Sequence, residues 1–309
     1  SMAFAAYTDK TGNVSGQTWP AGTYLITGEA YVDSGSTLTI QAGAVVKFNP
    51  GALLTIRGTL NAQGTAESQV VFTSRDDNTR GEIVSGSDGN PSPGDWDSIY
   101  LNGNGAYNGI GTFDYCLIRY GGSSADRPAN IYAYYSDNFT FTHSTSEFSA
   151  RNGLYTNSCS PTITNSIFRN NSIHGLYCNV GTPTVTNNTS DNNSQYAFRL
   201  ENVTITSYYD NAGVGNSTNG FGINGTVNGD ATWSTPLPCT LPYVILSSGV
   251  TISDDRKLTI TPGTVVKFEN PSSIINVYGE LYAVGTTTNS IVFTSLKDDA
   301  YGGDTNHNG

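Results

Sequence analysis

The chain has 309 residues and a formal net charge of −11, although only 13% of its residues are charged. An acidic surface of this kind repels polyanions, which argues against nucleic acids and anionic membrane surfaces as partners. No apolar run is long enough to cross a bilayer, so we expect no membrane insertion. The length suffices for one large domain or two small ones with a buried core.

Short strands separated by turns are predicted along the whole chain. Runs of Thr, Val, Ile and Tyr are interrupted by Gly and Asn, and no helical periodicity of useful length is present. We expect residues 1–17 to form an N-terminal extension or cap. The regular pattern begins near residue 18 and includes the segments TLTIQAGAVVKF (37–48) and VVFTSRDD (70–77). This composition predicts an all-β protein.

An acidic, Gly-rich insertion occupies residues 75–96. Carboxylate and amide oxygens are the ligands that Ca²⁺ prefers, and DTNHNG (304–309) also places oxygen ligands at alternate positions before a Gly. The alternative is that both segments are solvated loops, because the insertion lacks the D-x-N-x-N spacing. No cofactor is required by the sequence. A structural Ca²⁺ is predicted as an option for Asp76, Asp77, Asp88, Asp95 and Asp304.

The middle of the chain repeats itself every 22 residues. Phe141, Ile163 and Val185 occupy equivalent positions, each flanked by threonines. Alternate side chains of a strand face opposite ways, so the apolar positions predict inward rungs and the threonines outward ones. Asn165 and Asn187 fall at the strand ends, where Asn tolerates left-handed turns. Each repeat is then one coil of a solenoid whose core is shared between neighbours. The same spacing stacks a second apolar set, Leu154, Leu176 and Phe198.

A longer repetition relates the two ends of the chain. KLTITPGTVVKF (257–268) and IVFTSLKDD (291–299) restate the two segments quoted above, and residues 18–27 have a looser echo that begins at residue 232. We therefore expect a complete module over residues 18–231. Residues 232–309 are expected to start a second, truncated copy that continues the same solenoid.

These patterns resemble the repeats of a known fold family. PTITNSIFRNNSIHGLYC (161–178) and KLTITPGTVVKF resemble the right-handed parallel β-helix repeats of secreted bacterial proteins. The resemblance implies a right-handed parallel β-helix, or solenoid, with roughly 13 coils of about 22 residues. Pectate lyases, polygalacturonases, adhesins and carbohydrate-binding modules share this scaffold, so it does not fix the function. Among them the chain is similar to β-helix carbohydrate-binding modules attached to xylan-degrading enzymes, which implies a secreted or cell-surface location.

The outward positions of four strand motifs, SIYLN, NIYAY, GLYTN and GLYCN, form the predicted binding site. Aromatic rings stack on the C–H faces of pyranoses, while amides and carboxylates bind hydroxyl groups. The expected rung spacing of about 4.8 Å is comparable to one sugar unit of an extended β-linked chain. One predicted column contains Tyr100, Tyr132, Tyr155, Tyr177 and Arg199. The adjacent column contains Asn102, Tyr134, Asn157, Asn179 and Glu201.

Several alternatives remain open for these features. Exposed tyrosines are ordinary strand formers and stack on each other to stabilise a sheet, which would suit a passive spacer. An enzyme would need paired carboxylates, or a base with a metal or Arg, and the acids of the central coils form no such cluster. The Thr-x-Thr rungs suit an ice-binding face, but only three of them align cleanly. Buried thiols are expected, rather than a metal site or disulfides, for Cys116, Cys159, Cys178 and Cys239.

The sequence therefore predicts a non-catalytic module that binds a β-linked plant polysaccharide, xylan or a related hemicellulose, along its Tyr and Asn columns. Its other partners would be neighbouring domains of a larger secreted protein. The alternative is a structural stalk or adhesin spacer, and a polysaccharide lyase or glycoside hydrolase is the third hypothesis.

Overall fold

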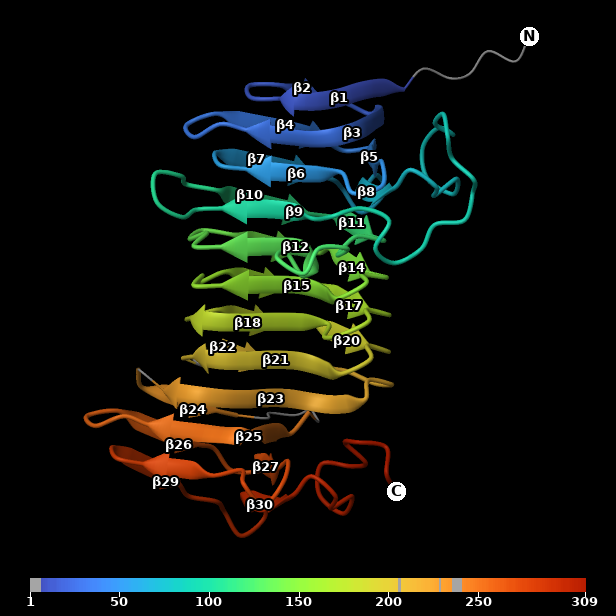
Figure 1. Ribbon diagram of the computed structural model, residues 1–309. Helices are drawn as coiled ribbons and strands as arrows, with labels where there is room; N and C mark the ends of the chain where they lie inside the picture. Colours follow the sequence, from blue (N-terminus) through green and yellow to red (C-terminus); the bar gives the residue numbers. More distant parts are fainter. Residues whose placement is uncertain (1–6, 205–206, 228, 235–240) are drawn as a thin grey trace.

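The computed structural model is a right-handed parallel β-helix of about 12 turns, stacked into a rod (Figure 1). It describes residues 7–204, 207–227, 229–234 and 241–309. All strand pairings between named strands in these ranges are parallel, which confirms the predicted fold class. Within the same ranges no helix could span a membrane.

Three walls of parallel strands enclose the core of the rod. Wall 1 contains β6 (Leu53–Ile56), β9 (Ile99–Asn102), β12 (Ala129–Tyr134), β15 (Asn152–Asn157), β18 (Leu176–Gly181) and β21 (Tyr196–Val203). Wall 2 contains β2 (Thr18–Trp19), β4 (Thr37–Gln41), β7 (Thr59–Gln63), β10 (Ile110–Asp114), β13 (Thr140–Thr142), β16 (Thr162–Thr164), β19 (Thr184–Thr186) and β22 (Ser207–Tyr209). Wall 3 contains β5 (Ala44–Phe48), β8 (Val70–Ser74), β11 (Cys116–Arg119), β14 (Thr145–Glu147), β17 (Ile167–Arg169) and β20 (Thr189–Asp191). The 11-residue strand β3 (Gly22–Val32) pairs with both β5 and β6, and β1 (Thr8–Asn13) pairs with β3.

The predicted 22-residue register is present in the hydrogen-bonded ladders. Phe141 pairs with Ile163, which pairs with Val185, and all three side chains are fully buried. Leu154 and Leu176 pair in the same way on wall 1, and Leu176 pairs with Phe198. The apolar rungs therefore stack inside the rod, as the sequence pattern predicts.

Left-handed residues make the corners between the walls. Asn165 and Asn187, predicted to tolerate such turns, have φ values of 53° and 56°. A single residue with positive φ reverses the chain sharply enough to start the next wall after one step. The corner after wall 1 uses Tyr135, Ser158, Val180 and Asn202. The corner after wall 2 uses Tyr115, His143, Asn165, Asn187 and Asp210. The corner after wall 3 uses Tyr120, Phe148, Asn170 and Asn192.

Buried asparagines join successive coils inside the corners. Asn171 donates through Nδ2 to Asn193 Oδ1 at 2.9 Å, and Asn193 donates in turn to Asn216 Oδ1 at 2.8 Å. Asn188 and Asn211 form a second such pair at 3.1 Å. These side chains satisfy the backbone groups that the turns leave unpaired, and so they hold neighbouring coils in register.

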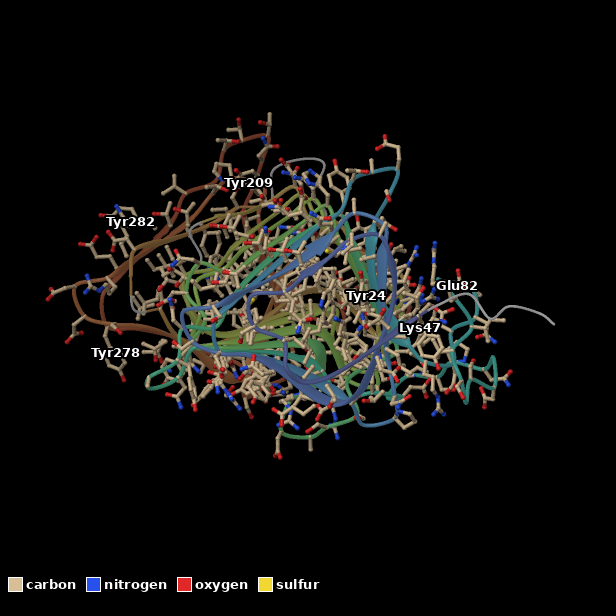
Figure 2. All side chains as sticks on the ribbon, turned by 90° about the horizontal axis from the view of Figure 1, so that it is seen from above. Tyr24, Lys47, Glu82, Tyr209, Tyr278 and Tyr282 are labelled. Carbon is tan, nitrogen blue, oxygen red and sulfur yellow. The ribbon has the colours of Figure 1, made fainter. Side chains whose placement is uncertain are left out.

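The insertion between β8 and β9 projects to one side of the rod and covers part of wall 3 (Figure 1). Lys47 is buried beneath it and donates from Nζ to the Asp77 carbonyl at 2.9 Å. The backbone N–H of Glu82 donates to Thr23 Oγ1 at 2.9 Å. Figure 2 shows Lys47 and Glu82 on the same side of the molecule. The acidic insertion is therefore fastened to the solenoid by a lysine and a threonine of earlier coils.

The C-terminal coils repeat the pairing of the N-terminal ones and continue the same rod (Figure 1). The first part of β25 pairs with β27 and its last part with β28, as β3 does with β5 and β6. Lys267 likewise donates to the Asp298 carbonyl at 2.9 Å, as Lys47 does to Asp77. At the other end β1, which lies inside the expected extension 1–17, pairs with β3; the module boundaries stay predictions. The strands of this region are β23 (Thr218–Val227), β24 (Ala231–Trp233), β25 (Tyr243–Ile252), β26 (Lys257–Ile260), β27 (Val265–Phe268), β28 (Ile275–Val277), β29 (Glu280–Ala283) and β30 (Val292–Ser295).

Candidate carbohydrate-binding wall

Four tyrosines form one outward column on wall 1. Tyr100 pairs with Tyr132, Tyr132 with Tyr155, and Tyr155 with Tyr177. Their ring centroids are 5.5, 5.1 and 4.4 Å apart, with interplanar angles of 9°, 28° and 6°. The rings are therefore stacked face to face along the rod, and their edges and hydroxyl groups are left to face outward. Arg199 continues this column, which we call the tyrosine column, beyond Tyr177.

A second outward column, the polar column, runs beside the tyrosine column. Its pairings place the residues one above the next in the predicted order, Asn102, Tyr134, Asn157, Asn179 and Glu201. The two columns are linked diagonally, because Tyr177 donates its hydroxyl hydrogen to Glu201 Oε2 at 2.8 Å. Side-chain hydrogen bonds also link Tyr132 to Asn157 and Tyr155 to Asn179. The two columns together form the tyrosine wall.

The phenol groups of the tyrosine column, Tyr100, Tyr132, Tyr155 and Tyr177, have raised pKa values and stay protonated at neutral pH. Partial burial raises the pKa of Tyr132 and Tyr155 above the usual value. Burial also raises the pKa of Tyr177, and its hydrogen bond to Glu201 raises it further. The Tyr177 hydroxyl, which donates to Glu201, keeps lone pairs that can accept from a ligand. The amides of Asn157 and Asn179 lower the pKa of Tyr132 and Tyr155 and therefore donate to these phenol oxygens, so each amide keeps a second N–H that can donate to a ligand.

Charged and aromatic groups mark both ends of the tyrosine wall. At the N-terminal end, the Arg127 guanidinium lies 6.0 Å from the Tyr100 ring centroid and forms an ion pair with Asp97. At the C-terminal end, Arg199 donates from Nε to Glu201 Oε1 at 2.8 Å. The next position of the tyrosine column is Gly222, where a Cβ atom would lie 2.7 Å from the Tyr196 ring. The ring of Tyr196 therefore replaces an outward side chain at this rung and ends the wall.

Some flanking residues were missed by the sequence analysis. His174 is buried against Tyr177 and Tyr196, and its Nδ1 accepts a hydrogen bond from the Tyr196 backbone N–H at 3.2 Å. Burial, together with the positive charge of Arg199, lowers its pKa to about 3. Arg127 and Asp97 were also missed as parts of the wall. The sequence signal that could have found His174 is its 22-residue spacing from Asn152 and Tyr196. These three side chains share no chemistry, so the spacing does not stand out as a column.

Two carboxylates of the central coils, Glu147 and Asp114, are already paired with protein groups. On wall 3, Glu147 forms an ion pair with Arg119 at 3.2 Å and accepts a hydrogen bond from Arg169 Nε at 2.7 Å. Asp114 accepts from Thr142 and lies 2.8 Å from His143 Nδ1. Glu201 is the one carboxylate in the two columns of the tyrosine wall, so these columns offer no pair of acids to flank a glycosidic bond.

The acids predicted as calcium ligands accept hydrogen bonds from different protein groups and do not converge on one point. Asp77 is buried and accepts from Thr73 Oγ1 at 2.7 Å. Asp95 accepts from Ser74 Oγ at 2.6 Å. Over the described ranges no group of three or more His, Cys, Asp or Glu side chains is arranged to hold a metal. Asp76 and Asp88 lie in the same insertion as these two, while Asp304 lies near Lys267 in the C-terminal coils; calcium binding stays a prediction.

Three of the four cysteines are buried free thiols, as expected. Burial raises the pKa of Cys159 to about 11 and that of Cys178 to about 12. Burial raises the pKa of Cys116 as well. Cys239 lies outside the described residues.

Comparisons with known proteins agree with the fold. A family model described as a pectate-lyase-like β-helix domain matches residues 13–135, and one described as the periplasmic copper-binding protein NosD matches residues 85–235. Protein bark beetle of Drosophila melanogaster is 35% identical over 72 residues, which make up 23% of this chain and 2% of that protein. The comparison with solved structures found no match. Together with the parallel coils, the two family matches show that this chain is a right-handed β-helix repeat protein.

Proposed function

We propose that the tyrosine wall binds a β-linked plant polysaccharide without cleaving it. The observation that carries the proposal is the unbroken column of four outward tyrosines beside a column of amides and a carboxylate. Such a surface combines apolar ring edges with hydrogen-bond donors and acceptors at each rung. Polysaccharides present the same combination, since each sugar has C–H groups and several hydroxyls.

The stacked geometry determines how a sugar would contact this wall. Each inner ring has both faces against its neighbours, so the contact expected from the sequence, sugar on ring face, is not available at Tyr132 or Tyr155. The proposal therefore uses ring edges and phenol oxygens. Asn157 and Asn179, each bonded to a phenol, would direct their remaining amide hydrogens to sugar hydroxyls.

The length of the wall sets the size of the ligand. Tyr100 and Arg199 are four rungs apart, which is about 19 Å at ~4.8 Å per rung. About four consecutive sugars of an extended β-linked chain would cover that distance. Arg127 at one end and the Arg199–Glu201 pair at the other would contact the sugars at the margins. We take xylan or a related hemicellulose as the first candidate, which rests on the family resemblance.

Copper, which the description of the second matching family names, is not part of this proposal. The described residues do not fit it, because Cys116, Cys159 and Cys178 are buried thiols whose raised pKa values disfavour the thiolate that binds metal. The Nδ1 atom of His174 is already used as an acceptor by the backbone. No cofactor has a role in the proposed binding.

The proposed location is outside the cytoplasm, either secreted or at the cell surface, as part of a larger protein with further domains. The periplasmic character of the NosD family supports this location. Cell-wall polysaccharides such as xylan lie outside the cell, so a wall that binds one would act there.

The proposal is tested by replacing one inner tyrosine. Tyr155→Ala should weaken binding to xylo-oligosaccharides by about 1–2 kcal/mol, because ring-edge and hydroxyl contacts are lost while the core rungs Leu154 and Thr156 are kept. Tyr155→Phe keeps the stack and removes the hydroxyl, so it separates the two contributions. Titration calorimetry with a β-1,4-xylohexaose measures both variants.

The matched control is Tyr209→Ala. Tyr209 is 46% exposed and lies on wall 2, away from the tyrosine column. Its replacement should leave xylohexaose affinity unchanged. Equal affinities for all three variants and the unmodified chain would reject the tyrosine wall as the binding site.

A structural spacer is the second candidate, and the mutual stacking of the tyrosines favours it. Stacked rings stabilise a sheet face without any ligand, and the equivalent contacts of Lys47 and Lys267 support a spacer built of repeated modules. Failure of the chain to bind any member of a broad glycan array would favour the spacer. Release of reducing or unsaturated sugars from xylan or pectin would instead favour a hydrolase or lyase.

A further inference from the structure

Two pairs of aromatic residues at the corners of the rod cover one another. Tyr115 stacks on His143, with ring centroids 4.7 Å apart and an interplanar angle of 10°. Tyr120 stacks on Phe148, with ring centroids 5.4 Å apart and an angle of 17°. All four residues have positive φ values, which strain the backbone of large residues such as Tyr and Phe. Ring stacking between successive coils offsets part of that strain.

Tyr135 is a corner residue that lacks such a partner among the described residues. Its φ value is 50°, and Ser158 occupies the equivalent corner of the next coil. The preceding coil approaches with Gly103, where an added Cβ atom would lie 2.0 Å from the Tyr135 carbonyl oxygen. Tyr135 is 49% exposed, and the one described ring in contact with it is that of Tyr134. Its ring is therefore neither buried nor covered by a ring of a neighbouring coil.

The Tyr135 ring is also turned relative to the tyrosine column. The column rings stack along the rod, so their planes lie roughly across its axis. The Tyr134 ring is close to that orientation, at 22° to Tyr132, whereas the Tyr135 ring stands at 78° to Tyr134 with centroids 4.7 Å apart. The plane of Tyr135 therefore runs roughly along the rod. The contact with Tyr134 covers at most one face of Tyr135, so at least one face stays open.

This orientation matches the sugar faces of an extended glycan. In an extended β-linked chain the mean plane of each pyranose roughly contains the chain direction, so a glycan along the rod presents C–H faces parallel to the rod. The inner tyrosines of the column offer edges and hydroxyl groups, whereas Tyr135 offers a ring face in the required direction. Its place is suitable as well, because the preceding residue, Tyr134, belongs to the polar column and pairs with Asn157.

We propose that Tyr135 is a stacking subsite that receives the C–H face of one pyranose of the bound glycan. The glycan then lies over the polar column, along the margin of wall 1 next to the corner, and the amides of Asn157 and Asn179 bind hydroxyl groups of the following sugars. This inference rests on the proposed function, since it concerns the same ligand, and it adds the residue that holds a sugar face. The uncovered ring thereby gives a strained corner a use in binding.

The test is to replace Tyr135 by Asn. The chain itself places Asn202 at an equivalent corner with a φ value of 52°, and Asn tolerates this backbone, so the substitution removes the ring and keeps the turn. Affinity for β-1,4-xylohexaose, measured by titration calorimetry, should fall about fivefold because the stacking contact is lost. The melting temperature should not fall, because relief of backbone strain offsets the lost contact with Tyr134. The conservative variant Tyr135→Phe keeps the ring face and should restore affinity to within about twofold of the unmodified chain.

The matched control is Tyr209→Asn, since Tyr209 is 46% exposed and lies on wall 2; it should keep the affinity of the unmodified chain. Tyr155→Ala is measured beside it. Unchanged affinity in Tyr135→Asn, with weakened binding in Tyr155→Ala, would overturn the stacking subsite and leave the tyrosine wall as the site. An equal loss in Tyr135→Phe, or a loss accompanied by a lower melting temperature, would assign Tyr135 a hydroxyl contact or a structural role and overturn the subsite as well. If the unmodified chain does not bind the oligosaccharide, both proposals fail.

Discussion

Single side chains set the character of each coil: inward apolar residues fill the core, corner residues adopt left-handed backbone, and outward residues carry the chemistry. Asn165 and Asn187 show that a corner residue can be predicted from the sequence, because Asn at a strand end in a fixed repeat points to a left-handed turn. His143 occupies the corner one coil before Asn165, with a φ value of 46°, and Phe148 occupies the corner one coil before Asn170, with a φ value of 51°. The position of Phe148 follows from the repeat register alone, since an aromatic residue does not favour this backbone.

His174 is the residue for which a pH effect is expected. Burial and the positive charge of Arg199 lower its pKa to about 3, against an ordinary value of 6.5. Between these two pH values the imidazole is protonated in the unfolded chain and neutral in the folded chain. The contribution of His174 to the free energy of unfolding is fully present above pH 6.5 and is lost as the pH falls toward 3. The slope is at most about 1.4 kcal/mol per pH unit. Chemical denaturation of the unmodified chain and of His174→Asn between pH 7 and 4 measures it.

Asn is chosen because Asn152 occupies the equivalent position one rung earlier, and because an Asn side chain does not titrate. It should therefore lose less stability than the unmodified chain over this pH range. Parallel stability curves for the two proteins would show that His174 does not contribute to acid sensitivity.

At the scale of elements, hydrogen-bonded asparagine ladders and stacked tyrosines connect one coil to the next. Asn193 is 2% exposed and uses both its amide hydrogens and its oxygen: it donates to Asn216 Oδ1 and to the Phe168 carbonyl, and it accepts from Asn171. The residues that make this ladder lie 22 or 23 positions apart, so only a repeat in correct register brings them together.

Replacing Asn193 by Ala should destabilise the protein by about 2–5 kcal/mol. The substitution leaves a backbone carbonyl, an amide and two asparagine side chains without their partners in a buried place. Urea unfolding followed by circular dichroism measures the change. Asn61→Ala on β7 is the control, because Asn61 faces outward in the column that Thr39 and Thr112 share, and it should change stability by less than about 0.5 kcal/mol. A comparable loss in both variants would mean that the ladder has no special role.

The ladders of strands and the presence of the insertion were predictable from the sequence, and the path of the insertion was not. The tyrosine and polar columns follow from apolar–Tyr–small–polar motifs, whose side-chain directions depend only on strand alternation. The face-to-face contact of the rings depends on side-chain torsions, which that alternation does not set. The path of the insertion depends on contacts of Lys47 with Asp77 and of Thr23 with Glu82, which are 30 and 59 positions apart and follow no repeat.

At the scale of the whole molecule, the two ends and the outer face of the rod have different properties. About 12 turns are present where roughly 13 were expected from a uniform coil length, because the coil between β8 and β9 takes up a long insertion. Near the N-terminal end the strand β1 is polar and Lys10 lies over the rings of Trp19 and Tyr24, whereas Val277 of β28 and Phe293 of β30 are each 45% exposed. On wall 1 the tyrosine wall ends at Gly222, so the proposed ligand site belongs to the middle of the rod and not to its ends.

The role of that middle region is tested most directly by a crystal structure of the chain with bound β-1,4-xylohexaose. The account predicts that the oligosaccharide lies along the rod over β12, β15 and β18, with hydroxyl groups bonded to the phenol oxygens of Tyr132 and Tyr155 and to the amides of Asn157 and Asn179. An oligosaccharide bound on wall 2 or wall 3, or an empty tyrosine wall at saturating ligand, would contradict it.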